Sequence, residues 1–130
     1  MSNDSNNQKI SLAAAFHRAL TSADWAAIGS LLTEDCVWTL PGDNRVSGRV
    51  EGSDEVVGRA RLIAGYGVDF ALLHLLESRD NMALSLHNTA NRNGVILDEH
   101  LTTVCTLREG RIASIETFLS DVAGMNAFFV

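Results

Sequence analysis

Side chains that could transfer a proton or hold a metal ion gather in the second half of the chain. Glu99 and Asn88 provide a carboxylate and an amide, and His74, His87 and His100 lie in the same stretch. A carboxylate in an apolar site keeps its proton more tightly than in water and can act as a general acid or base. Imidazole can also exchange protons near neutral pH, and it is a common metal ligand. Which of these roles is open to each residue depends on the strands that carry it.

Four successive strands are predicted in this half, over residues 69–79, 82–92, 95–108 and 111–119. Three dipeptides supply the turns between them, namely Asp80-Asn81, Asn93-Gly94 and Glu109-Gly110. Asn-Gly is the strongest of these signals, because both residues of the turn need a positive φ. The pattern predicts an antiparallel meander.

A two-residue turn at Asn93-Gly94 determines the register of its hairpin. It pairs Arg92 with Val95 and, further along, Asn88 with Glu99, and paired residues share one face of a sheet. The other members of that face are mainly apolar: Leu84, Leu86, Ala90, Leu97, Leu101, Thr103 and Cys105. Burying a carboxylate on a covered face costs free energy unless the group is paired, so the pattern predicts a cavity that holds ligand or solvent. The alternative is that Glu99 lies at the open end of the sheet and simply reaches water.

His87 and His100 form a cross-strand pair on the opposite, outer face. A two-residue turn at Asp80-Asn81 would set His74 opposite His87, and a row of three histidines could bind a metal ion. A polar outer face or a dimer interface is the favoured interpretation, since no cysteine or carboxylate completes a tetrahedral set, and no metal site is predicted. A three-residue turn would instead place His74 on the covered face, as a candidate acid or base.

Helices are predicted in the first half, over residues 10–21, 25–32 and 53–64, with a last short helix from about Asp121. Residues 36–40 favour an extended strand, and residues 42–52 are predicted to form a loop. Helices followed by a meander indicate one α+β domain with helices on one face of the sheet. We expect a disordered tail over residues 1–8 and a single domain over residues 9–130.

Composition narrows the function classes. A net charge of −6 disfavours binding to nucleic acid, and the sequence has no apolar run long enough to span a membrane. The first nine residues are polar and unlike a secretory signal. Cys36 and Cys105 match no metal or redox spacing and are predicted to be free, buried thiols. Together these features predict a cytoplasmic protein.

Short motifs run along the chain in a recognisable order. They are Ala23-Asp24-Trp25, Leu31 to Asp35, Trp38, Pro41-Gly42, Gly48 to Gly52, Leu97-Asp98, Glu109 to Ile112, Asp121 and Phe128-Phe129. Their order and spacing resemble the SnoaL-like branch of the nuclear-transport-factor-2-like superfamily, which also includes ketosteroid isomerases. The resemblance implies a curved antiparallel sheet wrapped on the N-terminal helices, forming a cone with an apolar cavity. It also implies a homodimer through the outer face of the sheet.

Superfamily members include cyclases, isomerases, dehydratases and proteins that only bind. Ketosteroid isomerases use an Asp base with a Tyr and a protonated Asp, and these positions fall on Leu40, Phe16 and Thr103. A ketosteroid-isomerase mechanism is therefore not expected. SnoaL-like cyclases use a carboxylate in the cavity, and Glu99 is the inward candidate, although it does not lie at the matched Asp position.

The resemblance and the Asn88–Glu99 pair together favour a cofactor-independent cyclase, isomerase or dehydratase that acts on a hydrophobic small molecule. Glu99 would exchange the proton, Asn88 would hold an oxygen, and His74 is a third catalytic candidate. The predicted pocket residues are Phe16, Trp38, Leu40, Leu84, Leu86, Leu101, Thr103 and Thr117. The alternative is a non-catalytic protein that binds a small molecule or serves in oligomerisation.

Overall fold

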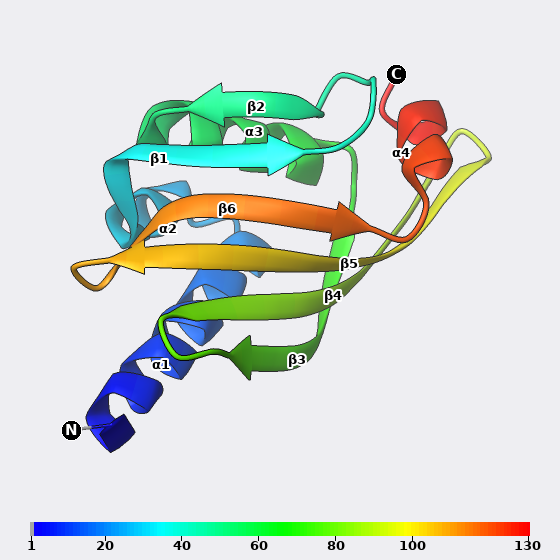
Figure 1. Ribbon diagram of the computed structural model, residues 1–130. Coiled ribbons are helices and arrows are strands. Elements are labelled where there is room, and N and C mark those ends of the chain that lie inside the picture. The colour runs from blue at the N-terminus through cyan, green and yellow to red at the C-terminus, as the bar shows by residue number, and fades with distance from the viewer. Residues whose placement is uncertain (1) are drawn as a thin grey trace.

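A six-stranded sheet and four helices make up residues 2–130, the part of the chain that the computed structural model describes (Figure 1). In chain order the elements are α1 (Ser2–Thr21), α2 (Trp25–Leu31), β1 (Leu32–Leu40), β2 (Gly48–Glu51), α3 (Ser53–Gly65), β3 (Asp69–Glu77), β4 (Asn81–Arg92), β5 (Val95–Arg108), β6 (Arg111–Leu119) and α4 (Val122–Phe128). The strand order is β2-β1-β6-β5-β4-β3, and every neighbouring pair is antiparallel except β1 and β6. The predicted α+β class with a curved, mostly antiparallel sheet is confirmed.

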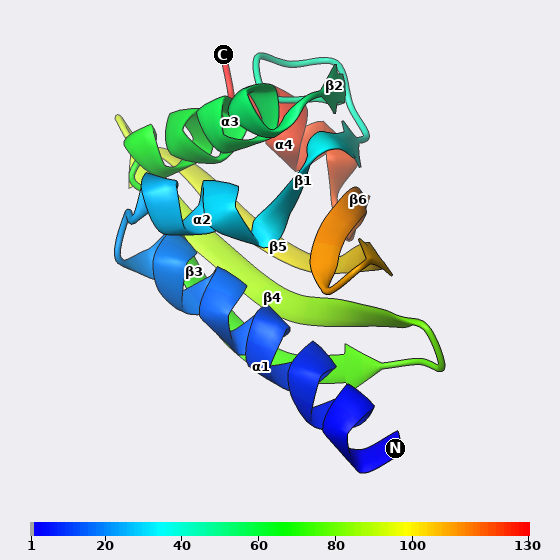
Figure 2. The ribbon, with the colours of Figure 1, turned by 90° about the vertical axis from the view of Figure 1, so that its left-hand side faces the viewer.

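The sheet curves around the helices, which cover its concave face (Figure 2). Helix α1 packs along β3 and β4, α3 packs against β1, and α4 packs against β5. Two clusters of buried apolar side chains fill the space between these layers. One lies under α1 and α2 and includes Ile28 and Leu32, and the other lies around α4 and includes Phe128 and Tyr66.

The β4–β5 hairpin has the predicted register. Asn93 and Gly94 adopt φ values of 55° and 85°, as a two-residue turn of this kind requires. Asn88 pairs with Glu99, and alternate residues point to the covered and the outer face. The position of Glu99 in the fold therefore follows from the turn.

Three segments differ from the predictions. The expected loop over residues 42–52 contains strand β2, because its last residues pair with β1 and place Val50 opposite Trp38. Strand β1 begins at Leu32, four residues earlier than predicted, and α2 ends accordingly at Leu31. Four residues, 78–81, separate the last pair of β3 and β4, which is Glu77 with Met82. Ser78 closes this connection by hydrogen-bonding to Asn81.

Helix α1 is longer than predicted. Its backbone is helical from Ser2, where a disordered tail was expected over residues 1–8, and Met1 lies outside the described residues. Lys9 joins α1 to the segment between β3 and β4, because its Nζ donates to the carbonyl oxygens of Ser78 and Arg79 at 2.6 and 3.0 Å. The division of the chain into a tail and a domain over residues 9–130 stays a prediction.

Cys36 and Cys105 are free and buried, as predicted. Burial raises the pKa of the Cys36 thiol to about 11 and that of Cys105 to about 12. Both thiols are therefore protonated at neutral pH and poor nucleophiles. Across residues 2–130, none of the helices has the length and apolar character that crossing a membrane requires.

The hairpin turn gives a test of the fold. Replacing Gly94 with alanine forces a Cβ into a left-handed conformation, which should lower the free energy of unfolding by about 1 kcal/mol. Gly58→Ala is the matched control: it lies inside α3 with open space around it, and it should raise stability by roughly 0.5–1 kcal/mol. Urea unfolding of both variants measures the difference. Equal effects of the two substitutions would contradict the turn geometry.

Candidate active site

A cavity of about 60 Å³ lies between the concave face of the sheet and the helices, where the two buried clusters meet. Its wall includes the eight predicted pocket residues, Phe16, Trp38, Leu40, Leu84, Leu86, Leu101, Thr103 and Thr117. The wall also includes Leu20, Ala60, Ile63, Phe70, Leu97, Ile115, Leu119, Met125 and Phe129, together with Asn88 and Glu99. The site is thus an apolar chamber with a few polar groups at defined places.

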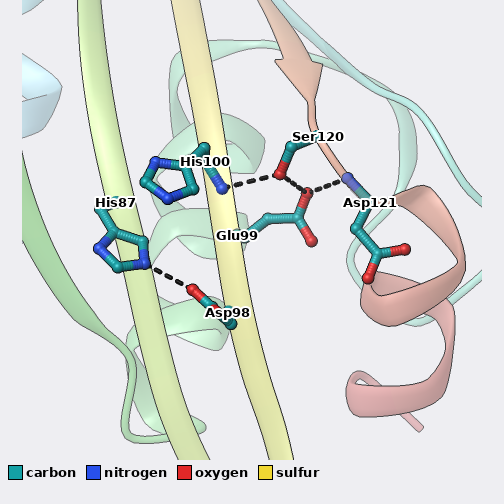
Figure 3. A network of polar contacts seen from close by, with 6 residues as sticks. All are labelled: His87, Asp98, Glu99, His100, Ser120 and Asp121. Atoms are coloured by element: carbon teal, nitrogen blue, oxygen red, sulfur yellow. Dashed lines mark hydrogen bonds and ion pairs between the residues drawn. The ribbon is translucent and has the colours of Figure 1, made fainter.

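Glu99 is the carboxylate of this chamber. It lies on the covered face of β5 and is only 1% exposed. One oxygen, Oε1, accepts a hydrogen bond from the backbone N–H of Asp121 at 2.8 Å and from the Ser120 hydroxyl at 3.4 Å (Figure 3). Ser120 Oγ in turn accepts from the backbone N–H of His100 at 2.9 Å. The segment that joins β6 to α4 therefore holds one side of the carboxylate in place.

The environment of Glu99 favours its protonated form. Burial raises the pKa of the carboxyl group above its ordinary value. The hydrogen bond from the Asp121 N–H lowers the pKa in opposition, while the negative charge of Asp121 raises it further. A carboxyl group whose pKa is raised toward the working pH is better suited to donating and accepting a proton than an exposed one.

Two oxygen atoms in the chamber lack a partner. Glu99 Oε2 and Asn88 Oδ1 are both buried, and neither has a hydrogen-bond partner within residues 2–130. They belong to directly opposed residues of β4 and β5. An unsatisfied buried polar atom costs about 1–3 kcal/mol, and a native structure tolerates it where a ligand or water supplies the missing donor. The pair therefore marks the polar end of the chamber.

A second polar group lies on the wall formed by β1, β5 and β6. Trp38 Nε1 donates to Thr117 Oγ1 at 3.0 Å, and the hydroxyls of Thr117 and Thr103 are 3.1 Å apart. On α3, the buried Arg59 lies over the Trp38 ring at 5.0 Å and donates to the carbonyl oxygen of Gly48 at 2.9 Å. These contacts hold Trp38 in place as a wall of the chamber, a role of Arg59 that the sequence did not indicate.

His74 does not belong to the chamber, so its catalytic assignment is corrected. It is exposed on the outer face of β3, opposite Ser85 rather than His87. The four-residue β3–β4 connection explains this, because it shifts the pairing by two positions relative to a two-residue turn. An even shift keeps His74 on the outer face and removes it from the pair with His87.

The outer face holds a different group of three residues. His87 and His100 stack with a ring separation of 4.1 Å, and His87 Nε2 lies 2.6 Å from Asp98 Oδ1 (Figure 3). The metal hypothesis drawn from the sequence did not include Asp98. The available signal was its spacing of two residues from His100, which puts both on one face of a strand.

Comparison with known proteins decides the family, because the family model for a SnoaL-like domain matches residues 13–115. The chain belongs to the SnoaL-like family. This confirms the resemblance found in the sequence. None of the curated proteins matches the chain.

Solved structures agree with the SnoaL-like assignment. Bal32a from a soil-derived mobile gene cassette has a TM-score of 0.90 and 25% identity, covering 95% of this chain and 98% of that one. A nuclear-transport-factor-2-like protein from Burkholderia xenovorans LB400 has a TM-score of 0.79 and 15% identity, covering 94% and 96%. TerC co-crystallized with polyporic acid has a TM-score of 0.80 and 16% identity, covering 93% and 98%. The last two likenesses show the fold.

The resemblance matched three residues of this SnoaL-like chain to the catalytic positions of ketosteroid isomerases, and all three lie in the chamber. Leu40, Phe16 and Thr103 all line the wall, and none of them carries a carboxylate or a phenol. Among the described residues that line the chamber, Glu99 is the one carboxylate. Any proton transfer by a carboxylate there must use Glu99.

The raised pKa of Glu99 makes a prediction for stability. The folded state holds this proton to a higher pH than the unfolded state, so its contribution to stability falls as pH rises through and above the ordinary range of a glutamate. Glu99→Gln removes the ionisation, so the variant should gain stability relative to the parent as the pH rises through and above the ordinary range of a glutamate. Urea unfolding across that range measures this, with Glu116→Gln, an exposed position on β6, as control. A difference that does not change with pH would contradict the assignment.

Proposed function

We propose that this SnoaL-like protein is a cofactor-independent enzyme that rearranges, cyclises or dehydrates a small hydrophobic molecule by general acid–base catalysis. The observation that carries the proposal is the unpartnered Oε2 of a buried glutamate, facing an apolar chamber beside the unpartnered Oδ1 of Asn88. The family includes cyclases and isomerases, which supports this class of chemistry.

Glu99 and Asn88 have different roles in the proposed reaction. Oε1 of Glu99 is held by Asp121 and Ser120, so Oε2 is the atom free to take a proton from a carbon beside a carbonyl group. The protonated carboxyl returns a proton to another atom of the same molecule, and no electron is gained or lost. The Nδ2–H group of the Asn88 amide is the donor that would hold the ligand oxygen on which negative charge develops, whereas Oδ1 accepts a hydrogen bond from the ligand.

The size and lining of the chamber limit the substrate. A volume of about 60 Å³ is well below the ~300–1,000 Å³ of pockets that hold drug-sized ligands. The substrate is therefore a compact molecule, or the flexible Met125 and leucine side chains of the wall move to admit a larger one.

Exchange of carbon-bound hydrogen with solvent tests the proposed chemistry without knowledge of the natural substrate. The protein should accelerate α-hydrogen exchange of cyclohexanone or acetophenone in D₂O, as followed by proton NMR. Glu99→Gln should reduce this acceleration by about 10²–10⁴-fold, the usual contribution of a general base.

His74→Ala is the control for this experiment, because it removes an exposed candidate that lies outside the chamber. Its exchange rate should equal that of the parent, and circular dichroism should show that all variants fold. Absence of exchange by the parent, or an unchanged rate in Glu99→Gln, would refute the assignment of Glu99.

A second candidate function is binding without conversion. It is favoured by the apolar wall and by the residues at the ketosteroid-isomerase positions, Leu40, Phe16 and Thr103. Mass spectrometry of the small molecule that co-purifies with the protein separates the two functions. Recovery of that molecule unchanged after long incubation favours the binder, and its conversion favours the enzyme.

We further propose a homodimer through the outer face of the sheet. Several apolar side chains are exposed there, among them Leu76, Ile96 and Phe118, with 47%, 67% and 55% of their surface accessible. If this face is shared, Ile96→Glu combined with Phe118→Glu should convert a dimer to a monomer in sedimentation experiments. An unchanged sedimentation coefficient would exclude this face.

A cytoplasmic location, to which the two free thiols are suited, stays a prediction.

A further inference from the structure

We propose that His87, Asp98 and His100 form a binding site for Zn²⁺ on the outer face of the sheet. Their candidate ligand atoms all lie within 4.8 Å of one another. The three side chains belong to the outer face of β4 and β5, and Figure 3 shows them apart from the carboxyl group of Glu99. This proposal does not depend on the proposed function.

The backbone holds the three residues in place. His87 and His100 are directly opposed in the β4–β5 register, and Asp98 belongs to the next pair along β5 that faces the same way. Both strands are paired without interruption from Asn81 to Arg92. Because the backbone is already ordered, metal binding costs little more than the freedom of three side chains.

The side-chain geometry lies close to that of a metal site. Ligands at about 2.0–2.2 Å from a tetrahedral Zn²⁺ are about 3.4 Å from one another. His87 Nε2 and Asp98 Oδ1 are 2.6 Å apart, so they must separate by less than 1 Å. The imidazole rings of His87 and His100, now parallel within 5°, must turn so that one nitrogen of each points at the same ion.

The exposure of the group permits these movements. The side chain of His87 is 32% exposed and that of Asp98 is 70% exposed. In a single copy of the chain an ion can therefore reach the group from solvent, and the side chains can turn without disturbing the core.

The ligand set selects the kind of ion. Two imidazoles and one carboxylate are the protein ligands of several zinc sites, and they leave the fourth position to water. Hard ions such as Mg²⁺ prefer oxygen ligands, so they are disfavoured here. The metal hypothesis drawn from the sequence relied on His74 beside His87 and His100 and lacked a carboxylate. In the observed register His74 lies opposite Ser85, and Asp98 is the third candidate ligand beside His87 and His100.

A metal titration of the full, tag-free chain tests the proposal. Isothermal calorimetry with Zn²⁺ should show one ion per chain, and Co²⁺ should develop the visible absorption bands of a low-coordinate site. His87→Ala, Asp98→Asn and His100→Ala should each weaken binding more than the ~10–100-fold that loss of a supporting partner costs. His74→Ala, a histidine on the same face, should bind as the parent does.

Two results would overturn the proposal. One is the absence of stoichiometric Zn²⁺ binding, which would leave the group as a surface ion pair. The other is binding that survives His87→Ala and His100→Ala, which would place the ion elsewhere. Asp98→Asn keeps the shape of an exposed side chain, so it tests the site even if a histidine variant folds poorly.

Discussion

The register of the β4–β5 hairpin is the constraint on which the rest of the structure depends. The turn at Asn93 and Gly94 determines which residues face each other, and a slip of one position would exchange the two faces. In the observed register Asn88 and Glu99 face the chamber, while His87 and His100 face outward. The Asn88–Glu99 pair and the outer histidine pair are therefore neighbours that the sheet separates.

Burial of Glu99 is tolerated because the rest of the fold compensates for part of its cost. The segment between β6 and α4 supplies hydrogen bonds to one oxygen, and the raised pKa keeps the group neutral to a higher pH than an exposed glutamate. The other oxygen is left without a donor. A site that is only half satisfied is poorly suited to a purely structural role and well suited to receiving a ligand.

The features that could be predicted from the sequence are those determined by residues close together in the chain. The Asn-Gly turn and the period of two gave the hairpin, its register and the inward position of Glu99. Contacts between distant segments could not be read in this way. Strand β2 depends on pairing with β1, and the hydrogen bonds to Glu99 come from Ser120 and Asp121. The loss of the predicted pair between His74 and His87 depends on the length of the β3–β4 connection.

The central claim is that the Glu99 carboxyl group is buried in the chamber and holds its proton beyond the usual range. Carbon-13 NMR of the glutamate side-chain carboxyls, with Glu99→Gln to assign the signal, measures this directly. Titration of Glu99 at a pH clearly above the ordinary value of 4.5 is the result predicted here. Titration at or below that value would show a solvated or ion-paired carboxylate and would contradict the account.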